Sequence, residues 1–156
     1  MENLRGKMDS TKRPQLIVID DDEFVLTVVT AILKREFDVF AFSTPSEALD
    51  FLEQHADKID IVISDQKMPS MSGVELLAKV KDKYSHISRV ILSGASDKFD
   101  VADAINIAEV DKFLFKPINS RLLLFSINEV MEKRTLEQKI KEQEEKIAQL
   151  LKQKQT

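Results

Sequence analysis

A lone carboxylate, Asp65, stands directly after a short β-branched run in the middle of the chain. The run is 61–63, Ser64 separates it from Asp65, and Pro69 closes the segment four residues later. In α/β proteins, ligands and reacting groups gather just outside the carboxyl ends of the strands. Asp65 is therefore a candidate reactive carboxylate, although a strand-end Asp taken alone is more often a turn residue.

Other polar residues follow other apolar runs in the same way. They are Asp20, Asp21 and Asp22 after the first run, Ser93 after the fourth, and Lys116 after the fifth. Each has an ordinary explanation by itself, since acidic residues and serines cap helices and lysines lie on surfaces. Their occurrence together at one predicted sheet edge is not explained by those separate roles.

The charges of this group indicate what it could bind. Two carboxylates ~4 Å apart repel by about 1 kcal/mol in water and by about 4 kcal/mol at an effective dielectric constant of 20. A cleft that collects Asp20, Asp21 and Asp65 therefore requires a cation. Oxygen ligands without His or Cys favour Mg²⁺. With a lysine and a hydroxyl nearby, the group is typical of a phosphoryl-transfer site in which Asp65 is the nucleophile.

Strands alternating with helices are expected to position these residues. Apolar runs predict strands over 16–19, 38–42, 60–64, 89–93 and 112–115. Apolar residues at helical spacing predict a helix after each strand. Asp22, Ser72 and Ser120 are the expected caps at the starts of three of these helices. This alternation predicts parallel pairing in a five-stranded, doubly wound α/β sheet.

One of these helices is expected to follow the fourth strand. Its predicted span is roughly 98–108, and its predicted apolar face consists of Val101, Ala104, Ile105 and Ala108.

The composition changes after Ile118, where the last helix is expected to run nearly to the C-terminus. Apolar residues fit heptad core positions at Leu136, Ile140, Ile147 and Leu150. A helix of ~30 residues spans about 45 Å, too long to pack wholly on so small a domain. A two-stranded coiled coil would bury the stripe. A solvated, fraying helix is the alternative, because polar residues occupy the core positions 133, 143 and 154.

Bulk composition sets the domain organisation and excludes several classes. The length of 156 residues suits a polar, disordered lead (1–14), one domain (15–130) and a helical extension predicted to form a coiled coil (131–156). The net charge of −4 argues against nucleic-acid binding, and the absence of cysteine excludes disulfides and thiolate chemistry. No run is long enough to cross a membrane and residues 1–13 lack a signal-peptide core, so a cytoplasmic location is expected.

Four motifs together resemble the receiver domain of bacterial two-component response regulators. They are Ile-Val-Ile-Asp-Asp-Asp at 17–22, Ser-Asp-Gln-Lys-Met-Pro-Ser-Met-Ser-Gly at 64–73, Ile-Leu-Ser-Gly at 91–94 and Phe-Leu-Phe-Lys-Pro at 113–117. The resemblance covers about three quarters of the chain. It implies a flavodoxin-like fold with strand order 2-1-3-4-5.

The resemblance also implies roles for the residues that match. Asp65 would accept a phosphoryl group from a sensor histidine kinase or a phosphotransfer protein. Asp21, Asp65 and the backbone carbonyl of Lys67 would ligate Mg²⁺, and Asp20 would act mainly through a bound water. Lys116 would pair with phosphoryl oxygens, and its peptide bond to Pro117 would be cis.

Further implied roles concern the response to phosphorylation. The hydroxyl of Ser93 would move to donate to the phosphoryl group, and Phe113 would then turn inward. Residues 97–125 would form the face that changes. Lys67 and Ala95 occupy positions that tune dephosphorylation in the family.

The expected function is a signalling receiver rather than an enzyme, with dimerisation or partner binding through the last helix as its output. An alternative is that the chain is the regulatory part of a longer response regulator, whose output domain is a cyclic-dinucleotide enzyme or a transcription activator. A Mg²⁺-dependent phosphatase is disfavoured, because Lys67 stands where a second catalytic Asp would be needed.

Overall fold

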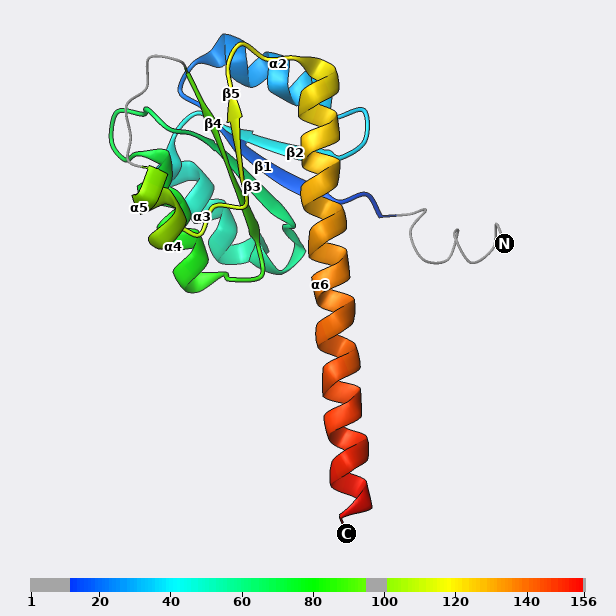
Figure 1. The fold of residues 1–156 in the computed structure, drawn as a ribbon. Helices are drawn as coiled ribbons and strands as arrows, with labels where there is room; N and C mark the ends of the chain where they lie inside the picture. The colour runs from blue at the N-terminus through cyan, green and yellow to red at the C-terminus, as the bar shows by residue number, and fades with distance from the viewer. Residues whose placement is uncertain (1–11, 95–100, 156) are drawn as a thin grey trace.

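A computed structural model describes residues 12–94 and 101–155 of the chain. Its core is a five-stranded sheet with strand order β2-β1-β3-β4-β5, and every neighbouring pair is parallel (Figure 1). The strands are β1 (Gln15–Ile19), β2 (Asp38–Phe42), β3 (Ile61–Asp65), β4 (Ser88–Ser93) and β5 (Lys112–Phe115). The predicted doubly wound α/β fold and its strand order are confirmed.

Helices cover both faces of this sheet. They are α2 (Glu23–Leu33), α3 (Pro45–His55), α4 (Gly73–Lys83), α5 (Val101–Asn106) and α6 (Ser120–Lys154), with a 3₁₀ turn η1 (Ala56–Lys58) after α3. Helices α2 and α6 lie on one face, and α3, α4 and α5 lie on the other (Figure 1). Because both faces are covered, the central strands are apolar throughout rather than alternating.

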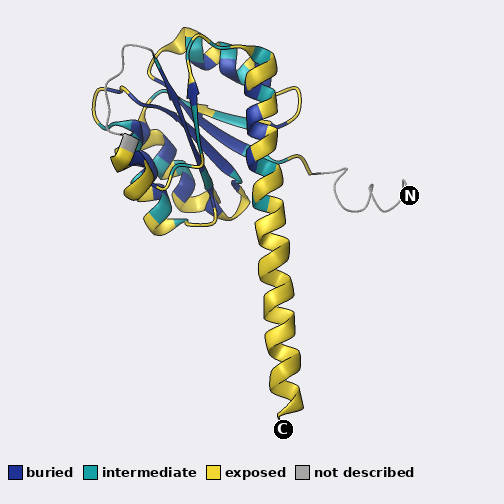
Figure 2. Ribbon diagram, in the orientation of Figure 1, coloured by how far each residue is buried: buried dark blue, intermediate teal, exposed yellow. Residues whose placement is uncertain are grey.

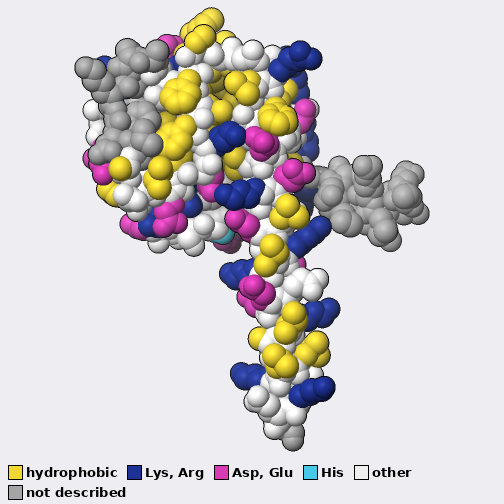
Figure 3. Space-filling view, viewed as in Figure 1, with side chains coloured by type: hydrophobic (Ala, Val, Ile, Leu, Met, Phe, Trp, Pro, Cys, Tyr) yellow, Lys and Arg dark blue, Asp and Glu magenta, His cyan; other side chains and the backbone are white. Residues whose placement is uncertain are grey.

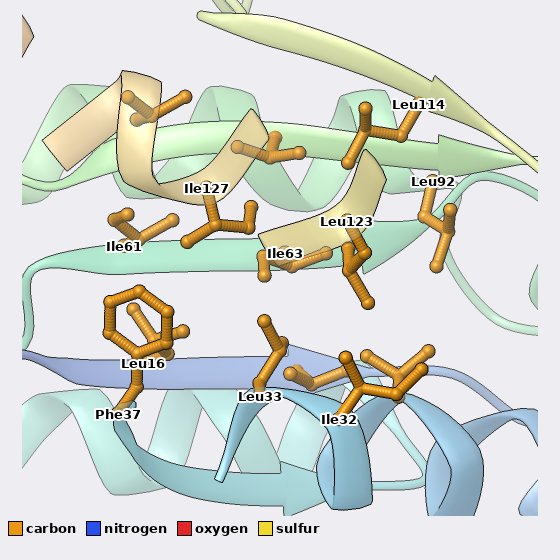
Figure 4. Close-up of a cluster of buried hydrophobic side chains, with 14 of the residues drawn as sticks. Leu16, Ile32, Leu33, Phe37, Ile61, Ile63, Leu92, Leu114, Leu123 and Ile127 are labelled. Atoms are coloured by element: carbon orange, nitrogen blue, oxygen red, sulfur yellow. The ribbon is translucent and has the colours of Figure 1, made fainter. Parts of the chain in front are cut away.

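Each face of the sheet has its own hydrophobic core. Figure 4 shows the core under α2 and α6, where Ile63 of β3 lies among Leu33 of α2 and Leu123 and Ile127 of α6. The opposite core joins β1, β3 and β4 to α3 and α4, with Ile17, Leu52 and Leu77 fully buried. The two cores hold the strand ends in fixed register.

The third strand, β3, lies one residue later in the chain than its predicted span of 60–64. Asp65 is the last residue of β3, pairs in register with Leu92 of β4 and is buried, where the sequence pattern had placed it just beyond the strand. The strand extends because its neighbour β4 is one residue longer at this end. Asp65 is consequently held by the sheet rather than by a loop.

The helix before β5 also differs from its prediction. Its described part spans Val101–Asn106, so it ends two residues before the expected end at 108. Ala104 and Ala108 are buried as predicted, whereas Ile105 is 52% exposed, so it does not belong to the packed face. The first residues of the predicted helix, and Ala95, lie outside the described residues.

The cap of the last helix is Asn119, not Ser120. Asn119 has extended backbone geometry, and its side-chain oxygen accepts a hydrogen bond from the N–H of Leu122 at 3.0 Å. Ser120 is already the first helical residue. Asp22 and Ser72 cap α2 and α4 as predicted.

Helix α6 starts beside the carboxyl ends of the strands and runs past the whole fold (Figure 1). Its buried residues are Leu123, Ser126, Ile127 and Val130. Arg134 makes the last contacts, donating to the carbonyl of His86 and lying 3.4 Å from Asp60 Oδ1. Residues 135–155 are all exposed, which Figure 2 shows as the projecting part of the helix.

Replacing Asn119 with Ala should lower the free energy of unfolding by about 1 kcal/mol, because the first turn of α6 loses its capping acceptor. Urea denaturation of the two single variants provides the measurement. Ser120→Ala is the matched control and should change stability by less than about 0.5 kcal/mol. The reverse order of effects would place the cap at Ser120 after all.

Candidate functional site

Four neighbouring strands bring the predicted site residues to one edge of the sheet. Asp20 follows β1, Asp65 ends β3, Ser93 ends β4 and Lys116 follows β5. The parallel register forces these strand ends together, because all carboxyl ends of a parallel sheet lie on the same side. The backbone N–H of Lys116 donates to the carbonyl of Ser93 at 2.8 Å and continues the pairing of β4 with β5 to the site.

The ammonium group of Lys116 lies between two buried carboxylates. Its Nζ is 3.1 Å from Asp20 Oδ2 and 3.1 Å from Asp65 Oδ1, and it donates a hydrogen bond to the latter. The carboxylate side chains are only 2% and 5% exposed. The peptide bond between Lys116 and Pro117 is cis, as the family resemblance implied.

Burial and charge act in opposite directions on these groups. Burial raises the pKa of Asp20 above its ordinary value, against the Asp22 backbone N–H and the charge of Lys116, which lower it. For Lys116, burial alone would lower the pKa, but the hydrogen bond to Asp65 and the charges of Asp20 and Asp65 together raise it. Lys116 is therefore a firmly protonated cation that faces a partly compensated acidic pair.

The acidic residues also fit a divalent cation. One oxygen from each of Asp20, Asp21 and Asp65 can be chosen so that all lie within 4.8 Å of one another. Asp20 Oδ1 accepts from the N–H of Asp22 at 2.9 Å, whereas its buried Oδ2 faces the ammonium group of Lys116 at 3.1 Å. Asp21 is exposed and open to solvent. Three carboxylates around one ammonium group leave net negative charge in an all-oxygen cluster, which suits a hard ion such as Mg²⁺.

The two residues predicted to respond to phosphorylation lie on adjacent strands. Ser93 is buried at the end of β4, and its Oγ donates to the carbonyl of Gly94 at 3.3 Å. Phe113 is half-buried in β5 and packs against the core under α3 and α4. Residue Phe115, two positions along the same strand, is 63% exposed. The side chain of Lys67 is exposed as well, at the start of the loop after β3.

Sequence reasoning missed the closure of that loop by Gln66. The side chain of Gln66 is buried, and its Oε1 accepts from the N–H of Val74 at 3.0 Å. Its carbonyl accepts from the N–H of Gly73 at 2.9 Å. A Cβ on Gly73 would lie 2.4 Å from the carbonyl oxygen of Asp65. The only signals in the sequence are the polar residue Gln66 next to Asp65 and Gly73, seven residues after Gln66.

The chain matches the response regulator receiver domain family over residues 16–128, well over half of its length. It belongs to this family. The receiver is a signalling domain that accepts a phosphoryl group, and receiver domains bind Mg²⁺. The acidic cluster and the lysine found at the sheet edge therefore agree with the phosphoryl-accepting chemistry of this family.

Curated relatives and solved structures show the same likeness. The heme response regulator HssR of Staphylococcus epidermidis is 34% identical over 74% of this chain and 50% of its own length. The hydrogenase transcriptional regulatory protein HoxA of Cupriavidus necator is 27% identical over 82% of this chain and 26% of its own. The chain thus spans a quarter to a half of the length of these two relatives.

Among solved structures, the signal receiver domain of an HD domain-containing protein from Pseudomonas fluorescens superposes with a TM-score of 0.73 at 28% identity. The match covers 80% of this chain and 98% of that one. In the described part of this chain, no helix is long and apolar enough to cross a bilayer.

Gly73→Ala should displace the end of β3, because the new methyl group meets the Asp65 carbonyl. We expect a loss of roughly 1–3 kcal/mol in unfolding free energy from this overpacking, together with slower labelling by a small phosphodonor. Denaturant unfolding and phosphoprotein mass spectrometry give the two readouts. Ser70→Ala, an exposed change in the same loop, should leave both unchanged. Normal stability and labelling in Gly73→Ala would show that the close approach is not needed.

Proposed function

We propose that this receiver is phosphorylated on Asp65 by a histidine kinase or a phosphotransfer protein, and that phosphorylation switches dimerisation or partner binding through α6. The observation that supports the site is the contact of Lys116 with Asp65 beside the acidic pair Asp20 and Asp21. No other carboxylate of this group ends a central strand while being buried and paired with a lysine.

The proposed reaction transfers one phosphoryl group between two side chains. A carboxylate oxygen of Asp65 attacks the phosphorus of a phosphohistidine, an oxygen–phosphorus bond forms, and the phosphorus–nitrogen bond to the imidazole breaks. Lys116 is placed to hold the negative charge that gathers on the phosphoryl oxygens. The sheet holds Asp65 with the geometry already set, so little reorganisation is required.

The metal ligands are assigned within the same proposal. Asp21, Asp65 and the carbonyl of Lys67 would hold Mg²⁺, and Asp20 would act through a bound water. When bound, the ion neutralises phosphoryl oxygens and lowers the repulsion between the acidic side chains. Mg²⁺ uses one or two carboxylates and keeps several waters, which suits a pocket with one exposed and two buried carboxylates.

A switch follows from the positions of three residues. A phosphoryl group on Asp65 offers acceptor oxygens that would draw the Ser93 hydroxyl away from its bond to the Gly94 carbonyl. Phe113 on the adjacent strand would turn into the space that opens. Since Lys116 precedes the cap of α6 by only three residues, these movements reach the start of α6 directly. Phosphorylation would bias two existing arrangements.

The exposed side of α6 supports dimerisation as the output. Leu136, Ile140, Ile147, Leu150 and Leu151 are all between 54% and 58% exposed. Burying this stripe in two chains contributes on the order of 10 kcal/mol. Association costs about 4–15 kcal/mol in lost freedom. Because the two magnitudes are close, a small change at the receiver can decide whether the helices pair.

A second proposal places the chain as the regulatory part of a longer response regulator. Its support is that the matching region makes up 50% of HssR and 26% of HoxA, and that HoxA is named a transcriptional regulatory protein. The output would then be a transcription activator or a cyclic-dinucleotide enzyme, with α6 as the connecting helix. Sequencing the reading frame around the chain distinguishes the two proposals.

Incubation with Mg²⁺ and a small phosphodonor should add one phosphate to the protein, and Asp65→Asn should abolish this addition because the nucleophilic oxygen is lost. Intact mass spectrometry measures the product. Asp22→Asn is the matched control, since Asn caps α2 equally well and the side chain lies outside the site. Phosphate retained in Asp65→Asn would place the acceptor elsewhere.

Lys116→Ala should leave Mg²⁺ binding largely intact, because removing the lysine frees acidic oxygens for the ion. Lys116→Ala should also uncouple phosphorylation from the change in α6, because the contact between the phosphoryl group and the Lys116 ammonium at the end of β5 is lost. Calorimetry with Mg²⁺ and hydrogen exchange of α6 before and after labelling test the two statements. Lys112→Ala, which removes an exposed pair with Glu129, is the control. A normal response of α6 in Lys116→Ala would remove the lysine from the switch.

A further inference from the structure

Charges of opposite sign border the two sides of the hydrophobic stripe on α6. In the heptad abcdefg, the stripe places Ile140 and Ile147 at a and Leu136, Gln143 and Leu150 at d. The flanking g positions are then Lys139 and Lys146, and the flanking e positions are Glu137 and Glu144. All of these residues are helical and exposed. One side of the seam is therefore basic and the other is acidic.

This separation distinguishes between the two ways in which two copies can pair. In a parallel pair, each g residue faces the e residue of the next heptad, so Lys139 faces Glu144 of the second copy, twice by symmetry. In an antiparallel pair, g faces g and e faces e. Lysines would then lie opposite lysines and glutamates opposite glutamates, which costs energy. The charges favour the parallel arrangement.

Gln143 favours the same arrangement for a different reason. In a parallel pair, d residues face each other, and the two Gln143 amides can hydrogen-bond across the seam. In an antiparallel pair, d faces a, which would bury the amide of Gln143 against Ile140 or Ile147 of the second copy. A buried amide without a partner is unfavourable, and a paired polar residue in the seam fixes the register.

One pair of charges opposes the parallel arrangement. Glu132 and Glu137 of the second copy would face each other where the helices leave the receiver folds. Lys133 stands at the adjoining a position and offers a compensating charge. The opposition is confined to the first heptad of the extension, whereas the complementary pair lies at its centre.

The stripe also lies on a free side of α6. At 100° per residue, its centre is roughly 130° around the helix axis from the buried side that contains Leu123, Ile127 and Val130. Leu122 and Phe125, which are 56% and 62% exposed, fall on the same outward side near the start of the helix. Figure 3 shows hydrophobic side chains on one visible side of the molecule, both beside the fold and along the extension.

We propose that the partner of this surface is a second copy of the chain in parallel orientation, with both receivers at the same end. This inference rests on the proposed function, because it assumes that α6 mediates dimerisation. It adds that the interface follows the outward side of α6 from Leu136 to Leu150, with Leu122 and Phe125 on the same side nearer the site. The start of that interface lies next to the site, so the Asp65 edge of each receiver lies at the same end of the dimer.

Single-cysteine variants of the full chain test the orientation, since the chain has no cysteine of its own. The wild-type mass is first measured by light scattering with and without phosphorylation. Leu150→Cys should then form a disulfide-linked dimer under mild oxidation, because d faces d in a parallel pair. Lys152→Cys, at an outward f position, is the control and should stay uncrosslinked.

Charge reversal gives an independent test, because the two arrangements predict different changes in dimer affinity. Lys139→Glu should weaken the dimer by roughly fivefold, because two attractive contacts become repulsive. Adding Glu144→Lys should restore the original affinity. Lys152→Glu makes the same charge change outside the seam and should have little effect. In an antiparallel dimer, Lys139→Glu would instead leave the affinity unchanged or increase it.

The outcomes separate the two proposals. A dimer that crosslinks at residue 150 and is weakened by Lys139→Glu supports the parallel arrangement. A dimer that does not crosslink at residue 150 and is not weakened by Lys139→Glu overturns the parallel arrangement. That result still agrees with dimerisation through α6. A chain that is monomeric at all concentrations, phosphorylated or not, overturns both. A parallel dimer with the same dissociation constant before and after phosphorylation supports the parallel arrangement and overturns the proposal that phosphorylation controls dimerisation.

Discussion

The contact of one ammonium group with two buried carboxylates is the constraint on which the structure depends. Lys116 Nζ lies 3.1 Å from both Asp20 and Asp65, at an edge where an exposed third carboxylate, Asp21, adds further negative charge. Buried charges are tolerated only when they are compensated. The compensation here is incomplete, since one ammonium group faces two buried carboxylates and an exposed third. The remaining negative charge fits a divalent cation, and receiver domains bind Mg²⁺.

The sheet connects the charged site to the last helix. Lys116 ends β5, Ser93 ends β4, and the backbone bond between them joins the two strand ends. Asn119 then starts α6, which is packed on the sheet through Leu123 and Ile127 and anchored at its far side by Arg134. In the proposed switch, a change in the charge at Asp65 would act on a helix that contacts the fold at both ends. The part beyond Arg134 continues the same helix to Lys154.

Much of this arrangement was predictable because it depends on local pattern. Continuous apolar runs predict buried parallel strands, and the polar residues after those runs predict a shared site edge that contains Asp20, Asp65, Ser93 and Lys116. The errors have physical reasons. Asp65 belongs to the strand because its neighbour β4 extends the pairing, and Asn119 caps α6 because backbone geometry rather than residue type decides the position of a cap.

Other features depend on tertiary contacts that a pattern does not encode. The Gln66 closure joins residues eight positions apart through a buried amide, and Ile105 is exposed although its neighbour Ala104 is buried. Neither is visible in hydrophobic spacing. The roles of Asp21, Lys67 and Phe113 rest on family resemblance together with their positions in the fold.

The dimer dissociation constant of the full chain, measured by sedimentation equilibrium before and after phosphorylation, tests the central claim most directly. The account predicts that phosphorylation tightens the dimer by about tenfold or more, equivalent to about 1.4 kcal/mol, and that Asp65→Asn shows no such change under the same treatment. An identical dissociation constant for phosphorylated and unphosphorylated protein would contradict it.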